Sequence, residues 1–179
     1  MASRRALQCG LAMTAAVLIA TNAWAQQKFK LTETPASTKS QYLQEHIIDV
    51  GDRPGHQIRI YEIRFEYLDK SQAFAGVAIK ESFTRGISDY TGWTGGFNTY
   101  VVYVLEDGSK VYARGTGTSQ STLKPDGSRD ALKYAFVESF VGGTGKFRGI
   151  RGLRRGSGER PSGANSLTEQ SEGEYWFEE

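Results

Sequence analysis

The run Gly142-Gly143-Thr144-Gly145-Lys146-Phe147-Arg148-Gly149-Ile150-Arg151-Gly152 says more about the fold than any other stretch of this 179-residue chain. Three glycines in its first four positions permit positive φ and close backbone approach, which a sharp turn between adjacent strands requires. The alternation from Phe147 to Arg151 then resumes a strand, which places Arg148 and Arg151 on opposite faces. The run therefore predicts a tight turn that leads into a β-strand.

Short strands separated by turn residues extend in both directions from this run. The candidate strands cover residues 42–50, 57–68, 72–83, 97–106, 109–118, 132–141, 148–158 and 167–177. Asp107-Gly108 marks the clearest hairpin, and no stretch of ten residues has the period of an amphipathic helix. Eight strands joined by short turns favour an all-β, eight-stranded antiparallel β-barrel, because closure removes exposed edges. A β-sandwich is the alternative, since counting strands does not separate the two.

The Gly142–Gly152 run resembles a signature of plant dirigent proteins, in which a similar G-G-T-G-K-F-R-x-x-R-G segment leads into a late barrel strand. Allene oxide cyclases share that barrel with a looser version of the segment. The resemblance implies an allene oxide cyclase/dirigent-like, calycin-type barrel, and it is strong only over these eleven residues. It also implies assembly into trimers through the barrel exterior.

The N-terminal residues have the pattern of a secretory signal peptide. Arg4 and Arg5 precede an apolar core over residues 10–20, and Ala23-Trp24-Ala25 forms an A-x-A cleavage site. We therefore expect a signal peptide over 1–25, a flexible leader over 26–41 and a single barrel domain over 42–179. Such a protein would be exported to the periplasm or the extracellular space, with no membrane insertion after cleavage.

Charge and composition exclude several classes of function. Without Arg4 and Arg5 the 22 basic residues fall to 20, which equals the 20 acidic residues, so a nucleic-acid partner is not expected. The glycine-rich run is not a phosphate-binding loop, because Phe147 stands where Ser or Thr must follow the lysine. His46 and His56 lack metal-ligand spacing, and Cys9 lies within the signal peptide. We expect neither a metal nor a cofactor.

The candidate chemistry lies on the strand over residues 132–141. One face carries four apolar or aromatic side chains and a single carboxylate, Glu138. If this face points inward, burial would make Glu138 a potential proton donor unless a cation pairs with it. Arg148 and Arg151 are the candidate partners, and only one of them can point into the same cavity. The alternative is an ion pair or a rim carboxylate with no chemistry.

Aromatic side chains are the candidate ligand contacts. The predicted ligand-binding residues are Tyr103, Tyr134, Phe136, Phe140 and Trp93. Trp93 lies with Asp89 and Tyr90 in a connection over 86–96, which we expect either to fold across the barrel mouth or to be an ordinary loop with packed aromatics. Both faces of the strand over 97–105 are apolar, so the outer one needs cover from another segment or from a second subunit, in a dimer or trimer.

Two functions of different classes follow from these residues. The resemblance implies an exported barrel that binds a small apolar molecule and directs its cyclisation or coupling, an isomerase-type activity if the protein is an enzyme. The alternative is a noncatalytic carrier of a small hydrophobic ligand in the same cavity. A barrel filled by its own side chains would instead favour a structural or interaction role.

Overall fold

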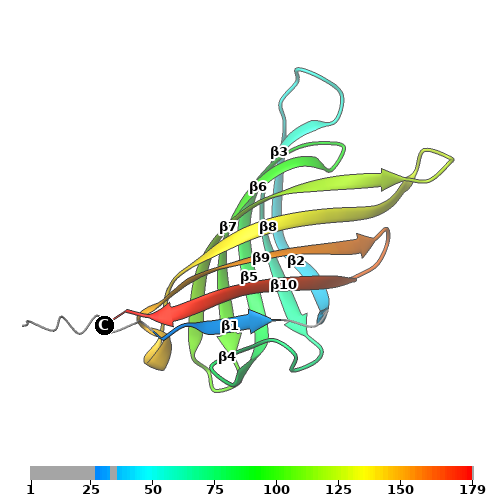
Figure 1. Cartoon of the computed structure of the whole chain (residues 1–179). Coiled ribbons are helices and arrows are strands. Elements are labelled where there is room, and N and C mark those ends of the chain that lie inside the picture. The colour runs from blue at the N-terminus through cyan, green and yellow to red at the C-terminus, as the bar shows by residue number, and fades with distance from the viewer. Residues whose placement is uncertain (1–26, 33–35, 179) are drawn as a thin grey trace, which may run out of the picture.

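A computed structural model describes residues 27–32 and 36–178 of the chain, and strands dominate them (Figure 1). The elements are β1 (Phe29–Thr32), β2 (Ala36–Asp49), β3 (His56–Tyr67), β4 (Ala73–Phe74), β5 (Val77–Thr91), β6 (Thr94–Leu105), β7 (Lys110–Leu123), β8 (Arg129–Gly143), η1 (Gly145–Phe147), β9 (Ile150–Pro161) and β10 (Ser166–Phe177). The predicted all-β class is confirmed. Among the described residues no helix is long and apolar enough to cross a membrane.

The antiparallel sheet closes on itself in a ring. Its path runs β10-β2-β3-β5-β6-β7-β8-β9 and returns to β10, so eight of the ten strands take part. Residues 166–169 of β10 pair with β2, and residues 172–175 of the same edge pair with β1. β4 adds a short hairpin to β5. Closure leaves each of the eight strands with a neighbour on both sides, which satisfies backbone groups that an open edge would expose.

Two predicted boundaries are wrong because left-handed residues turn the chain. The predicted strand over 72–83 is broken by Ala75 (φ 45°) and Gly76 (φ 77°), which form the β4–β5 turn. The predicted connection over 86–96 is almost all strand, and only the tight turn at Gly92 (φ 60°) and Trp93 (φ 72°) separates β5 from β6. Two successive left-handed residues suit the twist of a hairpin, so no long loop is needed there.

The predicted flexible leader contains structure. Residues 29–32 form β1 and residues 36–41 open β2, and Leu31 is buried in the hydrophobic core. Residues 29–32 and 36–39 both pair with β10, because β10 offers β1 a free edge beyond its short pairing with β2. The predicted signal peptide over 1–25 lies outside the described residues.

The glycine-rich run makes the predicted turn, but the strand after it begins later than predicted. Gly145–Phe147 form a single 3₁₀ turn, and Arg148 remains helical with φ −52° and ψ −45°. The strand alternation therefore starts at Ile150, and Phe147 and Ile150 are both fully buried. The alternation predicted from Phe147 to Arg151 is therefore wrong, because the 3₁₀ turn interrupts it before Ile150.

Large side chains fill one end of the ring, which we call the core end. Phe74 of β4 lies at its centre, with ring centroids 5.2 Å from Phe140 and 5.7 Å from Tyr175. The backbone N–H of Ala75 donates to the Tyr175 hydroxyl at 2.7 Å, which fixes β4 across this end. The core cluster consists of Leu31, Phe74, Ile79, Val101, Tyr103, Leu105, Val111, Ala113, Phe140, Phe147, Ile150 and Tyr175.

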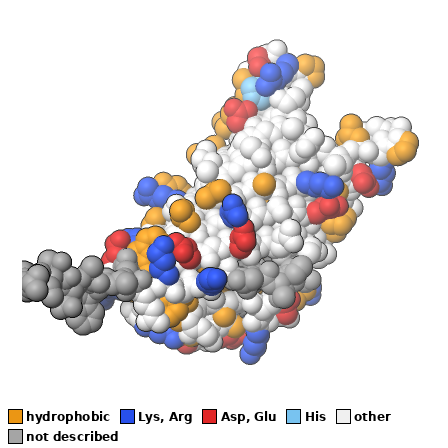
Figure 2. Space-filling view, in the orientation of Figure 1, with side chains coloured by type: hydrophobic (Ala, Val, Ile, Leu, Met, Phe, Trp, Pro, Cys, Tyr) orange, Lys and Arg blue, Asp and Glu red, His pale blue; other side chains and the backbone are white. Residues whose placement is uncertain are grey.

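The opposite end of the ring, which we call the hairpin end, carries the β2–β3 and β5–β6 turns. In Figure 1 the β2–β3 turn projects at the top, and β4 crosses the bottom. His56 at this turn contacts Asp52 at 2.5 Å through Nδ1 and Asp89 of β5 at 2.7 Å through Nε2. Figure 2 shows acidic, basic and histidine side chains gathered at the tip. The two hairpins are therefore joined by polar contacts rather than by an apolar core.

Inward-facing glycines make room for aromatic rings from neighbouring strands. Gly86 lies opposite Tyr61 and Gly156 lies opposite Phe136 in the strand register. A Cβ at Gly86 would lie 2.4 Å from the Tyr61 ring, and one at Gly156 would lie 2.6 Å from the Phe136 ring. Such pairing lets a ring lie flat against the neighbouring strand, and it leaves open space farther inside the ring of strands.

Candidate ligand-binding site

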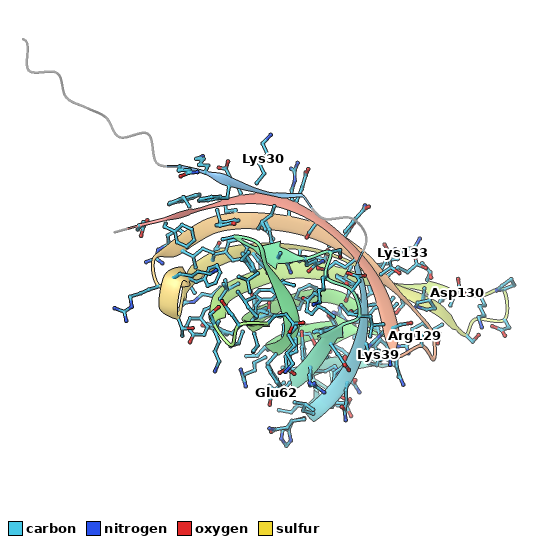
Figure 3. The ribbon with its side chains drawn as sticks, turned by 90° about the horizontal axis from the view of Figure 1, so that it is seen from below. Lys30, Lys39, Glu62, Arg129, Asp130 and Lys133 are labelled. Carbon is cyan, nitrogen blue, oxygen red and sulfur yellow. The ribbon has the colours of Figure 1, made fainter. Side chains whose placement is uncertain are left out.

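A cavity of about 150 Å³ lies inside the ring, next to the core cluster and extending toward the hairpin end. Figure 3 views the molecule from the β4 end and shows side chains crowding the interior of the curved sheet, while the labelled Lys30 points away from it. Ten aromatic side chains line the cavity: Tyr42, Tyr61, Phe65, Tyr67, Tyr90, Trp93, Phe97, Tyr103, Tyr134 and Phe136. A largely aromatic cavity of this size accommodates a molecule of about one six-membered ring.

A buried acid–base pair forms part of the cavity wall. Glu138 of β8 and Arg154 of β9 are direct cross-strand neighbours. They are 7% and 3% exposed, and Arg154 Nε donates to Glu138 Oε2 at 2.9 Å. Gly115 lies opposite Glu138, and Gly173 lies opposite Arg154 on the far side. A Cβ at Gly115 would lie 3.1 Å from Glu138 Cγ, and one at Gly173 would lie 2.7 Å from Arg154 Cα. The absence of side chains at these two glycines therefore makes room for the ion pair.

Tyr103 completes this pair to form what we call the polar triad, Tyr103, Glu138 and Arg154. The Tyr103 hydroxyl donates to Glu138 Oε2 at 2.6 Å and accepts from Arg154 Nη2 at 2.5 Å. Burial raises the pKa of Tyr103 well above its usual range. Tyr103 therefore remains a protonated donor at neutral pH, which suits its bond to a carboxylate.

The triad continues to a second carboxylate on β10. Arg154 Nη2 lies 3.5 Å from Glu169 Oε1, and the Tyr134 hydroxyl donates to Glu169 Oε2 at 2.9 Å. Burial raises the pKa of Tyr134 as well, with a further contribution from Glu169. The network thus places a guanidinium and two neutral hydroxyls between two carboxylates. It can hold a polar group of a ligand by hydrogen bonding, and it can stabilise charge that develops on an oxygen.

A second buried arginine lies nearer the hairpin end. Arg59 of β3 is 4% exposed, forms an ion pair with Glu45 and lies directly opposite Ser88 of β5. Its guanidinium stacks 3.7 Å from the centroid of the Trp93 ring. Trp93 is therefore held at the cavity by a cation–π contact, although it belongs to a two-residue turn.

The structure brings together some of the sequence-predicted site residues. Glu138, Tyr103, Tyr134, Phe136 and Trp93 all line the cavity, whereas Phe140 belongs to the core cluster and does not line it. The sequence analysis left open whether the face that carries Glu138 points inward. In the structure it does, because Phe136, Glu138 and Phe140 are buried while the residues between them are exposed.

The two predicted arginines do not reach Glu138. Arg148 is exposed and follows the 3₁₀ turn, and Arg151 forms an ion pair with Glu178 at 2.9 Å. Arg154, which the sequence analysis did not select, occupies the expected position. The chain did contain a signal for it: Gly152, Gly156 and Gly158 share its strand face, and inward glycines opposite large side chains mark this interior.

The histidines do not form a metal site. His46 is exposed on β2, and His56 is held by two aspartates at the hairpin end. Within residues 27–32 and 36–178 there is no group of three or more His, Cys, Asp or Glu side chains placed to hold a metal ion. Gln72, also missed by the sequence analysis, lines the cavity from the segment before β4 and is 1% exposed.

Comparisons of this chain with protein-family models, with curated proteins and with solved structures give no significant match. The similarity to dirigent proteins and allene oxide cyclases therefore rests on the residues of the Gly142–Gly152 run.

Proposed function

We propose that this protein binds a small, largely apolar molecule in the cavity inside its closed sheet. The observation that carries the proposal is the cavity itself, about 150 Å³ lined largely by aromatic side chains, with the buried polar triad in its wall. A purely structural ring would be expected to fill this space with its own side chains, as the core end does. Apolar walls provide affinity, and the few polar groups orient the ligand.

A second candidate function, directed cyclisation or coupling, is favoured by the convergence of Glu138 and an arginine on the cavity. This chemistry is what the resemblance to allene oxide cyclases and dirigent proteins implies. In it the aromatic walls would hold the substrate in one conformation, and Tyr103 and Arg154 would stabilise charge that develops on a substrate oxygen. Glu138 would take or return a proton, although its ion pair with Arg154 is also the arrangement that the sequence analysis gave as the alternative with no chemistry.

The proposal extends to the assembly and location of the protein. A calycin-type barrel related to dirigent proteins would form a dimer or trimer through its exterior, and Tyr100 on the outer face of β6 is 59% exposed and available for such a contact. The signal-peptide pattern supports export to the periplasm or the extracellular space.

Native mass spectrometry of the protein purified from its exported compartment tests the binding function. We expect a small apolar molecule to be retained under gentle conditions, and the same measurement counts the subunits. A protein that retains nothing, and that binds nothing from an extract of its host, would instead be a structural ring.

The retained molecule then allows the catalytic candidate to be tested with Glu138→Gln. Loss of turnover with binding preserved would support proton chemistry at Glu138, whereas unchanged turnover would refute it. Glu172→Gln is the matched control, because Glu172 forms the same kind of cross-strand pair, with Arg155, on the outer face. We expect the control to alter neither binding nor turnover.

A further inference from the structure

Gln72 is the cavity-lining residue in the described part of the chain whose side-chain donor and acceptor are both unpaired, whereas Thr38, Arg59 and Ser88 each have one such atom. It precedes β4 at the core end, lines the cavity and is 1% exposed. Its backbone carbonyl accepts from the N–H of Ile79 at 2.9 Å, which fixes the segment. Within the described part of the chain, neither its side-chain nitrogen nor its side-chain oxygen has a hydrogen-bond partner.

A buried amide with both atoms unpaired is costly, because each group has lost its hydrogen bonds to bulk water without replacement. Apolar side chains of the same size would fill this position at no such cost. Gln72 presents one donor and one acceptor to the cavity, and the group that satisfies both must itself accept and donate. Carboxamides, lactams and hydroxyl groups have this property, whereas hydrocarbons and ethers do not.

The charges of the cavity argue for an uncharged ligand. Arg59 is paired with Glu45, Arg154 is paired with Glu138 and lies 3.5 Å from Glu169, and Arg160 at the cavity wall lies over the Tyr42 ring. An anion at the two buried arginines would have to compete with these carboxylates, and a cation would have to displace an arginine from them. Either change would weaken a buried ion pair, which is strongly unfavourable.

We infer that the ligand is a neutral molecule, about one ring in size, whose donor–acceptor group is recognised by Gln72 at the core end of the cavity. This inference rests on the proposed binding function and specifies the ligand class for it. The ring of the ligand lies among the aromatic walls, and Gln72 selects its polar group. Gln72 is thus a specificity residue. It is separate from the hydrogen bonds that join the three members of the polar triad to one another.

Three probes of nearly equal shape test the inference: toluene is apolar, benzamide is neutral with a donor and an acceptor, and benzoate is anionic. Their dissociation constants are measured by ligand-observed NMR titration on the wild-type protein and on Gln72→Met, which keeps the side-chain length. We expect the preference for benzamide over toluene to fall about tenfold in Gln72→Met, as the loss of one or two buried hydrogen bonds predicts. Gln120→Met on the exposed face of β7 is the matched control and leaves the preference unchanged.

The outcomes separate this inference from the proposed function. If toluene and benzamide both fail to bind the wild-type protein, the binding function is wrong. If toluene binds but the preference is the same in Gln72→Met, water alone satisfies Gln72 and the inference is overturned. Tighter binding of benzoate than of benzamide would overturn the requirement for a neutral ligand.

A measurement on the wild-type protein covers the case in which Gln72→Met does not fold. The side-chain amide resonances of Gln72 are followed by ¹⁵N NMR during titration with benzamide and with toluene. We expect benzamide to shift them strongly and toluene to shift them weakly. Equal shifts with the two probes would overturn the inference.

Discussion

The core end and the cavity of the closed sheet are built from the same strands with the same inward alternation, yet one is filled and the other is open. At the core end, inward side chains such as Phe140 and Tyr103 converge on Phe74. Around the cavity, large inward residues face glycines and small polar residues across the strands, as Phe136 faces Gly156 and Arg59 faces Ser88. Side-chain volume at alternate positions, and not the strand pattern, thus decides where the ring is hollow.

The comparison also separates two ways of burying polar groups. At the core end the Tyr175 hydroxyl has a backbone partner, so the apolar cluster is locally complete. Around the cavity the members of the polar triad bond to one another, while both side-chain polar atoms of Gln72 are unpaired. An unpaired buried amide costs stability, and this is the physical reason why we propose a binding site there.

The largest effect is expected from Phe140→Ala, which removes a ring from the filled core end. We expect the free energy of unfolding to fall by about 4 kcal/mol, since the surrounding rings cannot close the new void. Phe136→Ala should cost less, about 2 kcal/mol, because the Phe136 ring already borders a cavity. Denaturant unfolding of both variants measures the difference, and equal losses would contradict the distinction between the two regions.

Arg154→Met tests the polar wall of the cavity. Removing the guanidinium leaves the buried Glu138 and the half-buried Glu169 without their shared cation, so we expect a loss of about 3 kcal/mol at neutral pH. Arg155→Met is the matched control on the next residue, which pairs with Glu172 on the outer face where salt bridges contribute less than about 1 kcal/mol. Similar losses in the two variants, measured by denaturant unfolding, would show that the triad is not an isolated buried network.

Gly117→Ala tests the pairing of glycines with aromatic rings. A Cβ at this position would lie 2.3 Å from the Ala135 carbonyl oxygen and 2.4 Å from the Phe97 ring, so we expect a loss of about 2 kcal/mol from overpacking. At Gly96 the nearest atom to such a Cβ is 3.9 Å away, and Gly96→Ala should be neutral or slightly stabilising. Thermal unfolding of the two variants checks this contrast, and a neutral Gly117→Ala would mean that the sheet yields locally.

The smallest effect is expected at the hairpin end, where His56 joins two hairpins. Hydrogen bonds that the imidazole of His56 donates to the carboxylates of Asp52 and, to a smaller extent, Asp89 raise its pKa in the folded protein. The resulting stabilisation is complete below the unfolded pKa of about 6.5 and is lost as pH rises through the higher folded pKa. Wild-type stability should therefore decline from mildly acidic to mildly alkaline pH relative to His56→Gln.

Asp52→Asn serves as the control for this pH dependence, because it removes the first of the two carboxylate partners. We expect the decline with pH to become smaller in this variant, as measured by denaturant unfolding across the same range. A decline that is the same in wild type, His56→Gln and Asp52→Asn would assign it to other groups.

The strands and hairpin turns were largely predictable from sequence. Alternation separated the two faces of β6 and β8 without saying which one points inward, and Asp107-Gly108 identified the β6–β7 turn, where Gly108 has φ 80°. The errors occurred where one residue pair reverses the chain, at Ala75-Gly76 and at Gly92-Trp93. Ala75 and Trp93 are unusual in the left-handed region, so composition alone gave no sign of these turns.

The candidate site was predictable only in part. Glu138 stood out because it interrupts an apolar face. The aromatic residues on the same face of β8 indicated that its surroundings are aromatic. Its arginine could not be chosen, because the 3₁₀ turn at Gly145–Phe147 shifts the alternation that a continuous strand would have kept. Gln72 carried no signal, since it lies in an irregular segment whose burial depends on distant strands.

The sequence by itself determined the local features of this protein, namely its strands, most of its turns and the relative faces of residues within one strand, because these depend on neighbours two or three positions away. The tertiary structure decided which strands close the ring, which arginine meets Glu138 and where the interior remains open. Those outcomes depend on register and on the summed volumes of side chains from different strands. Residues far apart in sequence, such as Tyr103, Glu138 and Arg154, become one site only through that register.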